Sequence, residues 1–384
     1  MSTYAPGTPR IEAPPHTTAL RVDGAAIAYR LYDIGYAIDL DRASTLFAPE
    51  STERVRPGRS EAQALQITNP PLSVALGSER IRIAGVVHIA TVSARLFDFG
   101  TCSLQLRFEA PPCLPWDDFS AFGTTVDASP ALTEVFVRHL GALRDRVSPA
   151  VERPNLASVV EDYVVFRITR ITDPSGAPLS PEVLTDDHLV PLLLHEERRL
   201  SADARRELLP HRFSYYADDL TILTWDNALV VEPRAEDRDV EYILGFANAQ
   251  LLELRYYDAV LTGELPTMYD RVAAARSRIF ALPTSRYRPL LARLQTRVAD
   301  VTETVERVEN ALKVTDDVYL ARIYAVALEL FRGAAWRRGI ERKLAIVRET
   351  YTMFNAESQA ARGELLEMAI IALILVEIVV GMLR

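Results

Sequence analysis

The stretch IRIAGVVHIATVSARLFDFGTCSLQLRF, residues 81–108, carries the pattern that decides the fold. It divides into two strand-like runs, residues 81–99 and 102–108, which lie on either side of Gly100 and Thr101. Gly100 suits the turn between them because glycine accepts a positive φ. The sequence therefore predicts two consecutive strands over this stretch.

Working outward, the flanking segments complete a recognisable order. Residues 25–34 read as a strand and residues 39–46 as a short helix that begins after an aspartate cap. Residues 131–147 have apolar side chains at helical spacing, and residues 163–171 read as a further strand. The order strand, helix, strand, strand, helix, strand predicts an α+β body. Its sheet is expected to be a ferredoxin-like split βαβ sheet with helices on one face.

The long helix predicted over residues 239–261 is apolar around most of its circumference, which indicates burial between other elements. Several polar side chains interrupt it, and buried polar groups must be hydrogen-bonded or paired. One interpretation is a structural network that fixes the helix against the sheet, and the other is a ligand or recognition site between them. The residues concerned are Asn248, Gln250, Glu253, Arg255 and Asp258.

Two later segments carry the seven-residue spacing of a coiled coil, one over residues 287–312 and one over residues 344–365. They predict an antiparallel helical hairpin over residues 286–364. The two seams can close on each other within one chain, or they can pair with a second chain. The sequence therefore divides into a flexible tail (1–24), an α+β body (25–285), the hairpin and a C-terminal segment (365–384).

The C-terminal segment is almost entirely apolar, and over residues 365–383 a helix would just match a hydrocarbon core of about 30 Å. Glu367 can reach the interface, whereas Glu377 near the middle would cost about 2.5–3.5 kcal/mol. We expect a transmembrane tail anchor in which Glu377 favours self-association. The alternatives are an interfacial or oligomerisation helix and an ordinary core helix.

Composition and motifs exclude several classes of protein. The net charge of −9 argues against general attraction to nucleic-acid phosphates, so direct nucleic-acid binding is not expected. The two cysteines form no disulfide framework and no zinc pattern. No glycine-rich phosphate loop or nucleophile elbow occurs in the sequence. The sequence thus nominates no catalytic residue, no metal ligand and no cofactor.

Several stretches resemble one family. They are FANAQLLELRYYD (246–258), VENALKVTDDVYLARIY (308–324), Trp336 with Lys343 and Leu344, and the closing run that begins at Arg362 and contains Glu377. They are similar to the "required for meiotic nuclear division" family with its YagE-type bacterial relatives, also known as domain of unknown function 155. LYDIGYAIDL (31–40) and LFDFG (96–100) carry a weaker similarity.

The resemblance implies an α/β body, a helical hairpin and a C-terminal membrane helix. It also implies a protein or ribosome partner, since eukaryotic members are mitochondrial inner-membrane proteins linked to translation. The N-terminus shows no transit peptide, so we expect a bacterial cytoplasmic-membrane protein with its bulk in the cytoplasm. The expected function is a non-enzymatic, homo-oligomeric, tail-anchored scaffold. The alternative is an enzyme or small-ligand-binding protein with a site between the sheet and helix 239–261.

Overall fold

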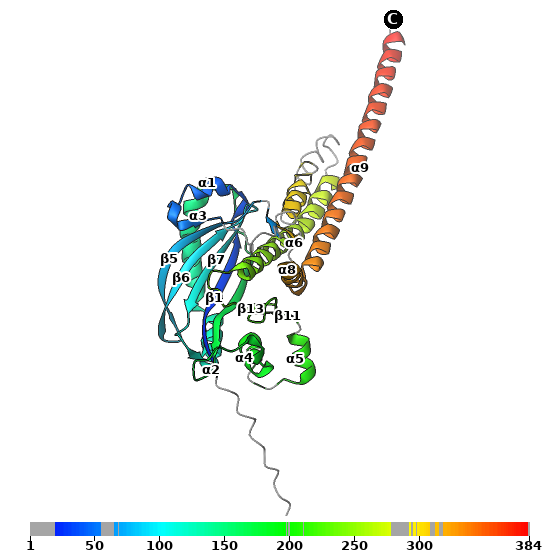
Figure 1. Ribbon diagram of the computed structural model, residues 1–384. Helices are drawn as coiled ribbons and strands as arrows, with labels where there is room; N and C mark the ends of the chain where they lie inside the picture. The colour runs from blue at the N-terminus through cyan, green and yellow to red at the C-terminus, as the bar shows by residue number, and fades with distance from the viewer. Residues whose placement is uncertain are drawn as a thin grey trace, which may run out of the picture.

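The computed structural model describes residues 20–54, 65–67, 69–196, 198, 200–209, 211–277, 292, 295, 296, 298–307, 312–314 and 318–382. Figure 1 shows a large sheet with helices on both sides and a long final helix that projects away from the body. Most of the flexible tail predicted over residues 1–24 lies outside the described residues. Residues 21–24 are the start of the first strand.

The described strands are β1 Arg21–Asp33, β2 Gly35–Ile38, β3 Thr52–Glu53, β4 Leu65–Ile67, β5 Leu72–Ile83, β6 Val86–Leu96, β7 Thr101–Glu109, β8 Leu114–Pro115, β9 Val151–Pro154, β10 Val160–Thr172, β11 Arg212–Phe213, β12 Leu220–Leu223, β13 Asn227–Val231 and β14 Leu312–Val314. The α-helices are α1 Leu40–Ser44, α2 Trp116–Asp127, α3 Ala131–Val147, α4 Asp186–Leu194, α5 Ala202–Leu208, α6 Asp239–Ser277, α8 Val318–Leu330 and α9 Gly333–Met382.

Among the described residues, ten strands form one mixed sheet in the order β11-β12-β13-β10-β1-β7-β6-β5-β3, with β8 beside β1. The 13-residue strand β1 is central and pairs antiparallel with β7 and with β10. Strand β13 joins β10 in parallel. The α+β class expected from the sequence is what the structure shows. The sheet, however, is mixed and much wider than a ferredoxin-like split βαβ unit.

Helices cover both faces of this sheet. Successive side chains of β1 point to opposite faces, so the strand contributes to two cores. Ala26 and Ala28 face the core that α2, α3 and α4 complete, whereas Ile27, Tyr29 and Leu31 face α6 and α8. The expectation of helices on one face only was wrong. It omitted α6, whose apolar circumference is buried against the second face.

The strand predicted over residues 81–99 was also wrong, since it contains a turn. Ala84 has φ 48° and Gly85 has φ 85°, so both lie in the left-handed region that a tight two-residue hairpin turn requires. Strands β5 and β6 pair on either side of this turn. Alanine rarely adopts this conformation, which is why the local pattern gave no turn signal.

The long helices pack together as a layer beside the sheet. Leu254 and Tyr257 of α6 pack in one cluster with Val301 of the helical segment 298–307 and with Ile340 and Leu344 of α9. Val298, Val301 and Val305 of the predicted seam therefore pack within the chain, with α6 as a third member. Leu312, the predicted last member of this helical seam, lies instead in strand β14, which pairs with β4. The remainder of residues 286–317 lies largely outside the described residues, and pairing with a second chain stays a prediction.

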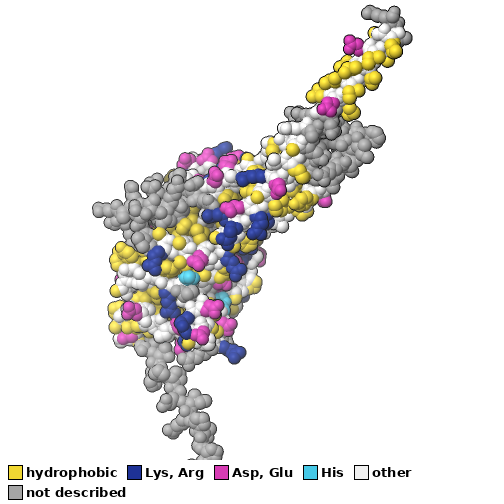
Figure 2. Space-filling model, turned by 90° about the vertical axis from the view of Figure 1, so that its right-hand side faces the viewer, with side chains coloured by type: hydrophobic (Ala, Val, Ile, Leu, Met, Phe, Trp, Pro, Cys, Tyr) yellow, Lys and Arg dark blue, Asp and Glu magenta, His cyan; other side chains and the backbone are white. Residues whose placement is uncertain are grey.

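The predicted transmembrane helix at residues 365–384 was wrong. In the part of the chain that the structure describes, no helix combines the length and the apolarity needed to cross a membrane. The exposed apolar stretch of α9, residues 366–382, rises about 25 Å, short of the roughly 30 Å of a hydrocarbon core, and it contains Glu367 and Glu377. The predicted tail anchor and the single-span membrane location were wrong for the same reason, whereas the lipid bilayer as a partner stays a prediction. Figure 2 shows this stretch as the yellow end of the projecting helix.

Candidate functional site

Two of the polar residues nominated on helix α6 hold that helix together or tie it to α8. The Asn248 amide donates to the carbonyl of Leu244 one turn earlier, at 2.9 Å. The Gln250 side-chain carbonyl accepts from the Tyr324 hydroxyl of α8, at 2.5 Å. Both side chains are buried, so each contact satisfies a group that would otherwise lose its hydrogen bonds to water.

Two further nominated residues tie α6 to other elements through ion pairs. Arg255 pairs with Glu161 of strand β10. Asp258 accepts from the Lys343 ammonium of α9 at 2.6 Å. Burial raises the pKa of Glu161 to about 7, against the opposing effect of the Arg255 charge. These four nominated residues therefore contact four different neighbours and do not form one site.

Glu253, the fifth nominated residue, faces a second buried carboxyl group. Its Oε1 atom accepts from the Thr101 hydroxyl at 2.7 Å. Thr101 is the direct partner of Asp33 in the register of β7 and β1. Asp33 and Glu253 are each only 2% exposed. The packing of α6 on the sheet thus brings together two carboxyl groups that lie far apart in the sequence.

The surroundings of this pair favour its protonated forms. Burial raises the pKa of Asp33 to about 7, although the Gly35 backbone N–H donates to its carboxylate at 3.0 Å. Burial also raises the pKa of Glu253 well above its ordinary value, and the charge of Asp33 raises it further. Desolvation and a like charge both disfavour an ionised carboxyl. The surroundings therefore favour the protonated form of both carboxyl groups, and the pKa of Asp33 is raised into the neutral range.

Two glycines fix the backbone around Asp33. The Ile34 N–H donates to the Gly100 carbonyl at 3.1 Å, which joins the Asp33–Gly35 turn to the Asp98–Gly100 turn. Gly100 has φ 102°, and a Cβ atom there would lie 1.8 Å from the Gly35 oxygen. Only glycine fits at position 100. The weakly similar stretches 31–40 and 96–100 therefore meet at this point.

A cavity of about 290 Å³ lies over Asp33, between β2, β9, α6 and the helical segment that contains Val301. Its size equals the liquid volume of about ten water molecules, at roughly 30 Å³ each. Asn155 and Tyr256 line it together, and the Asn155 amide donates to the Tyr256 hydroxyl at 3.1 Å. The cavity thus combines a buried, titratable floor with polar walls.

Arg153 and Tyr36 line this cavity on one side. The Tyr36 ring lies 3.9 Å from the Arg153 guanidinium and 5.1 Å from that of Arg307. Arg153 pairs with Asp300 at 3.0 Å, and its backbone has the uncommon φ of 44°. A non-glycine residue in this region is strained, and such residues concentrate at functional sites. The strained backbone at Arg153 therefore favours the rim of this cavity as part of a functional site.

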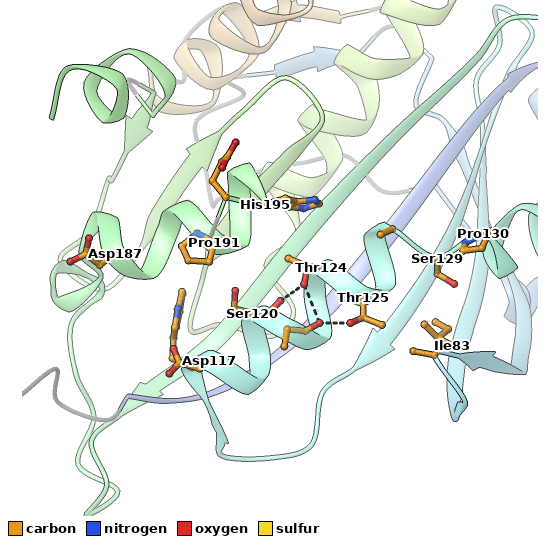
Figure 3. Close-up of a pocket in the computed structure, with 15 residues that line it drawn as sticks. Ile83, Asp117, Ser120, Thr124, Thr125, Ser129, Pro130, Asp187, Pro191 and His195 are labelled. Atoms are coloured by element: carbon orange, nitrogen blue, oxygen red, sulfur yellow. Dashed lines mark hydrogen bonds between the residues drawn. The ribbon is translucent and has the colours of Figure 1, made fainter. Parts of the chain in front are cut away.

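A second cavity, an open groove of about 850 Å³, lies between α2 and α4 (Figure 3). Thr124 and Thr125 line it, but their hydroxyls donate to carbonyls of their own helix. His195, beside the groove, pairs with Asp127 at 3.2 Å and ends α4 with a φ of 54°. The titratable residues that line this groove are exposed ones. It therefore lacks the buried titratable group that distinguishes the Asp33 cavity.

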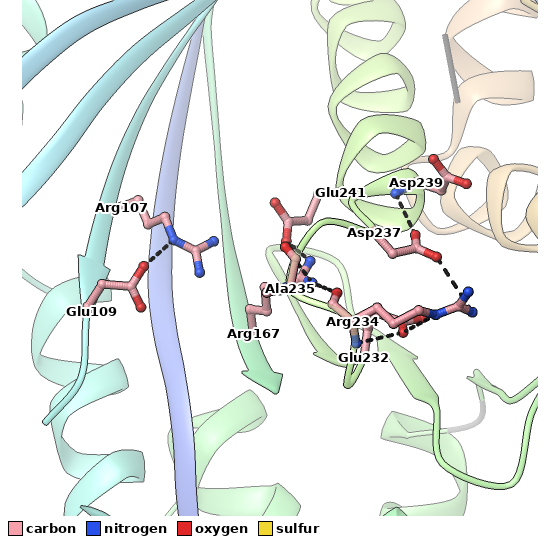
Figure 4. A network of polar contacts seen from close by, with 9 residues as sticks. All are labelled: Arg107, Glu109, Arg167, Glu232, Arg234, Ala235, Asp237, Asp239 and Glu241. Atoms are coloured by element: carbon pink, nitrogen blue, oxygen red, sulfur yellow. Dashed lines mark hydrogen bonds and ion pairs between the residues drawn. The ribbon is translucent and has the colours of Figure 1, made fainter. Parts of the chain in front are cut away.

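A third polar cluster lies inside the body and is fully paired. Arg167 of β10, 1% exposed, donates to Glu241 of α6 at 2.6 Å and to the carbonyl of Arg234 at 2.7 Å (Figure 4). No cavity described in the structure is lined by Arg167 or Glu241. This pair fixes the start of α6 against the sheet.

The sequence interpretation named Glu253 but missed its partner and the cavity walls. Asp33 ends an apolar strand just before a glycine, and Asp98 has the same local setting, which is the one signal that the sequence offered. Among the described residues, no group of three or more side chains could hold a metal ion. Nothing in this geometry assigns a cofactor.

Comparisons with known proteins find similarity in the part of this chain that contains the large sheet. Residues 23–238 match the family model described as "Uncharacterized protein MJ0711, N-terminal domain". Uncharacterized protein MJ0711 of Methanocaldococcus jannaschii is 25% identical over 243 residues, which cover 63% of this chain and 72% of the archaeal protein. No solved structure matches the chain. None of this tests the resemblance to the meiotic-division and YagE-type family, which stays a prediction. Since this family model matches more than half of the sequence, the chain belongs to the family of the MJ0711 N-terminal domain.

Proposed function

We propose that this protein binds a small polar molecule in the Asp33 cavity and that Asp33 exchanges a proton with it. The observation that carries this proposal is the position of Asp33. Its carboxyl group is almost fully buried, lies near the buried carboxyl group of Glu253 and yet lines a cavity. Carboxyl groups with a pKa near the working pH are the ones suited to general acid–base chemistry.

The charges around the cavity narrow the class of ligand. Arg153 at the rim is already paired with Asp300, so it offers little net charge to an anion. The floor carries the titrating Asp33, which in its ionised form accepts hydrogen bonds and attracts a cation. We therefore propose a ligand that presents an amino or hydroxyl group to Asp33.

A non-enzymatic scaffold is the second candidate. Of the five polar residues nominated on α6, three join α6 to α8, α9 or the sheet, and Asn248 bonds within α6. Such contacts support a rigid body that needs no ligand. The two candidates differ in whether the Asp33 cavity has an occupant.

A thermal-shift screen of small amines, amino acids and polyols tests the proposal. We expect compounds that raise the unfolding temperature of the natural protein and of Asp118→Asn, an exposed control on α2, but not of Asp33→Asn or Val260→Trp. Asp33→Asn removes the titrating group, and Val260→Trp fills the cavity that Val260 lines. Compounds that stabilise all four proteins equally, or no stabilising compound at all, would support the scaffold.

A further inference from the structure

Exposed aromatic side chains gather at the edge of the sheet formed by β11 and β12. Tyr215 is 61% exposed, Tyr216 is 44% exposed, and Trp225 in the β12–β13 turn is 48% exposed. The rings of Tyr215 and Tyr216 are 4.8 Å apart, and Tyr215 continues to Tyr319 of α8 at 5.6 Å. Tyr215 thus lies near the start of α8, whereas Trp225 lies past the other end of that helix, with its ring 6.1 Å from that of Phe331.

Arginines lie over the aromatic rings of this region. The guanidinium of Arg322 is 5.6 Å from the ring of Phe213, and that of Arg332 is 5.9 Å from the ring of Trp225. Arg234 lies 5.6 Å from the ring of Tyr216. Figure 2 looks onto this side of the molecule, where Lys and Arg side chains gather between the sheet body and the long helices. We call Tyr215, Tyr216, Trp225, Arg234, Arg322 and Arg332 the arginine–aromatic surface.

Two of these arginines carry a positive charge that no acidic residue described in the structure neutralises. Arg234 is paired with Glu232 and Asp237, but neither Arg322 nor Arg332 forms an ion pair with a residue that the structure describes. A guanidinium stacked on a ring keeps its N–H edge free to bind a carboxylate through two hydrogen bonds. Both arginines are therefore held in place and still able to bind an anionic group.

Backbone strain adds an independent observation at Arg332. This residue connects α8 to α9 with a φ of 53°, in the left-handed region where helices usually end on glycine. A residue with a Cβ atom is strained in this conformation. The guanidinium of Arg332 lies over the ring of Trp225, so Arg332 and Trp225 form the end of the surface beyond α8.

We infer that the arginine–aromatic surface docks another protein through an acidic segment that also carries aromatic or aliphatic side chains. Trp, Tyr and Arg are enriched among the residues that supply most of the binding energy in protein interfaces, and here they are exposed at both ends of α8. The unpaired guanidiniums of Arg322 and Arg332 receive carboxylates, while Trp225 and the tyrosines pack against apolar side chains. Charge complementarity thus specifies an acidic partner.

The charge of the whole chain favours a protein over a nucleic acid. At a net charge of −9 the molecule repels an extended polyanion, whose affinity depends on many phosphate contacts. A short acidic segment interacts mainly within a Debye length of about 8–10 Å, where the local arginines dominate. The surface therefore suits a short acidic segment.

The test uses the full chain and a short, fluorescently labelled copolymer of about ten residues, glutamate and tyrosine in a 4:1 ratio. Binding is measured by fluorescence anisotropy at 50 and 150 mM salt. Oligo(dT) of matched length is the competing probe. We expect the copolymer to bind, oligo(dT) to bind at least tenfold more weakly, and the double variant Arg322→Glu/Arg332→Glu to lose at least tenfold in copolymer affinity.

The matched control reverses two exposed arginines elsewhere, Arg80→Glu/Arg82→Glu on β5, and should leave the affinity unchanged. Because charge reversal can disturb folding, Trp225→Ala is measured as a separate variant and is expected to weaken binding as well. Absence of copolymer binding, equal loss in the control variant, or oligo(dT) binding as tight as the copolymer would overturn the inference.

Discussion

Replacing Asp33 with asparagine isolates the effect of burying an ionisable group beside Glu253. Asparagine has nearly the same shape, and its carbonyl can still accept from the Gly35 N–H that now donates to Asp33. The substitution removes only the ionisation. Any change in stability that depends on pH therefore reports the pKa of Asp33 in the folded protein.

The size and sign of the effect follow from the two pKa values of Asp33. Its pKa is about 7 in the folded chain and 3.8 as the ordinary value. The folded state holds the proton more tightly, so the contribution of Asp33 to stability is fully present below pH 3.8 and is lost as pH rises through 7. The total is about 4 kcal/mol, of which roughly 3 kcal/mol is lost between pH 5 and pH 8.

Urea unfolding of the natural protein and of Asp33→Asn at pH 5, 6, 7 and 8 measures this effect. The stability of the variant relative to the natural protein should rise by about 3 kcal/mol across this range. Asp118→Asn, which changes an exposed aspartate, should show no such trend. A difference that stays constant with pH, or a variant that becomes less stable toward pH 8, would refute the assignment of a raised pKa to Asp33.

Three further predictions concern a glycine contact, a buried ion pair and self-association through α9. Gly100→Ala should lower the free energy of unfolding by more than about 4 kcal/mol, because its Cβ atom would meet the Gly35 carbonyl. Gly85→Ala is also at positive φ but in open space, so it should cost only about 1–2 kcal/mol. Equal losses of stability for the two variants in urea unfolding would contradict the clash. Arg167→Met should lower the free energy of unfolding by about 3–5 kcal/mol, because it leaves Glu241 buried and unpaired. The double variant Arg167→Met/Glu241→Leu should recover part of this stability. If the double variant recovers none, the unpaired carboxylate is not the cause of the loss. A chain that ends at Glu364 lacks the exposed apolar residues 366–382 and should form smaller species than the full chain in light scattering; identical masses would argue against self-association through α9.

The sequence was most informative where structure depends on local periodicity. Helix α3 begins and ends at Ala131 and Val147, as predicted, because its apolar residues follow one helical face. The turn at Ala84 and Gly85 escaped prediction because alanine is an unusual residue for a left-handed conformation. The width of the sheet also escaped, since strand neighbours such as β10 and β13 are set by tertiary pairing.

The candidate site shows the same limit. Glu253 attracted attention because a carboxylate interrupts an apolar helix, but nothing local connects it to Asp33. Their contact depends on α6 crossing the end of β1 beside Thr101. The similarity at residues 31–40 and 96–100 involved two aspartate–glycine turns, yet only the fold shows that Gly35 and Gly100 touch. Pairwise proximity across the chain is the information that local patterns lack.

Ligand binding and proton release must be linked if Asp33 acts as proposed. A donor or cation placed in the cavity stabilises ionised Asp33, which burial otherwise disfavours, and so lowers the pKa of Asp33. Affinity for an amine should therefore rise as pH increases from 6 to 8, by up to about tenfold, because at lower pH the ligand must displace a proton. Glu253→Gln removes a carboxyl group but leaves Asp33 buried, and burial is the first cause of its raised pKa. The pH dependence should persist in Glu253→Gln and vanish in Asp33→Asn. An affinity that is independent of pH in the natural protein would separate ligand binding from the ionisation of Asp33.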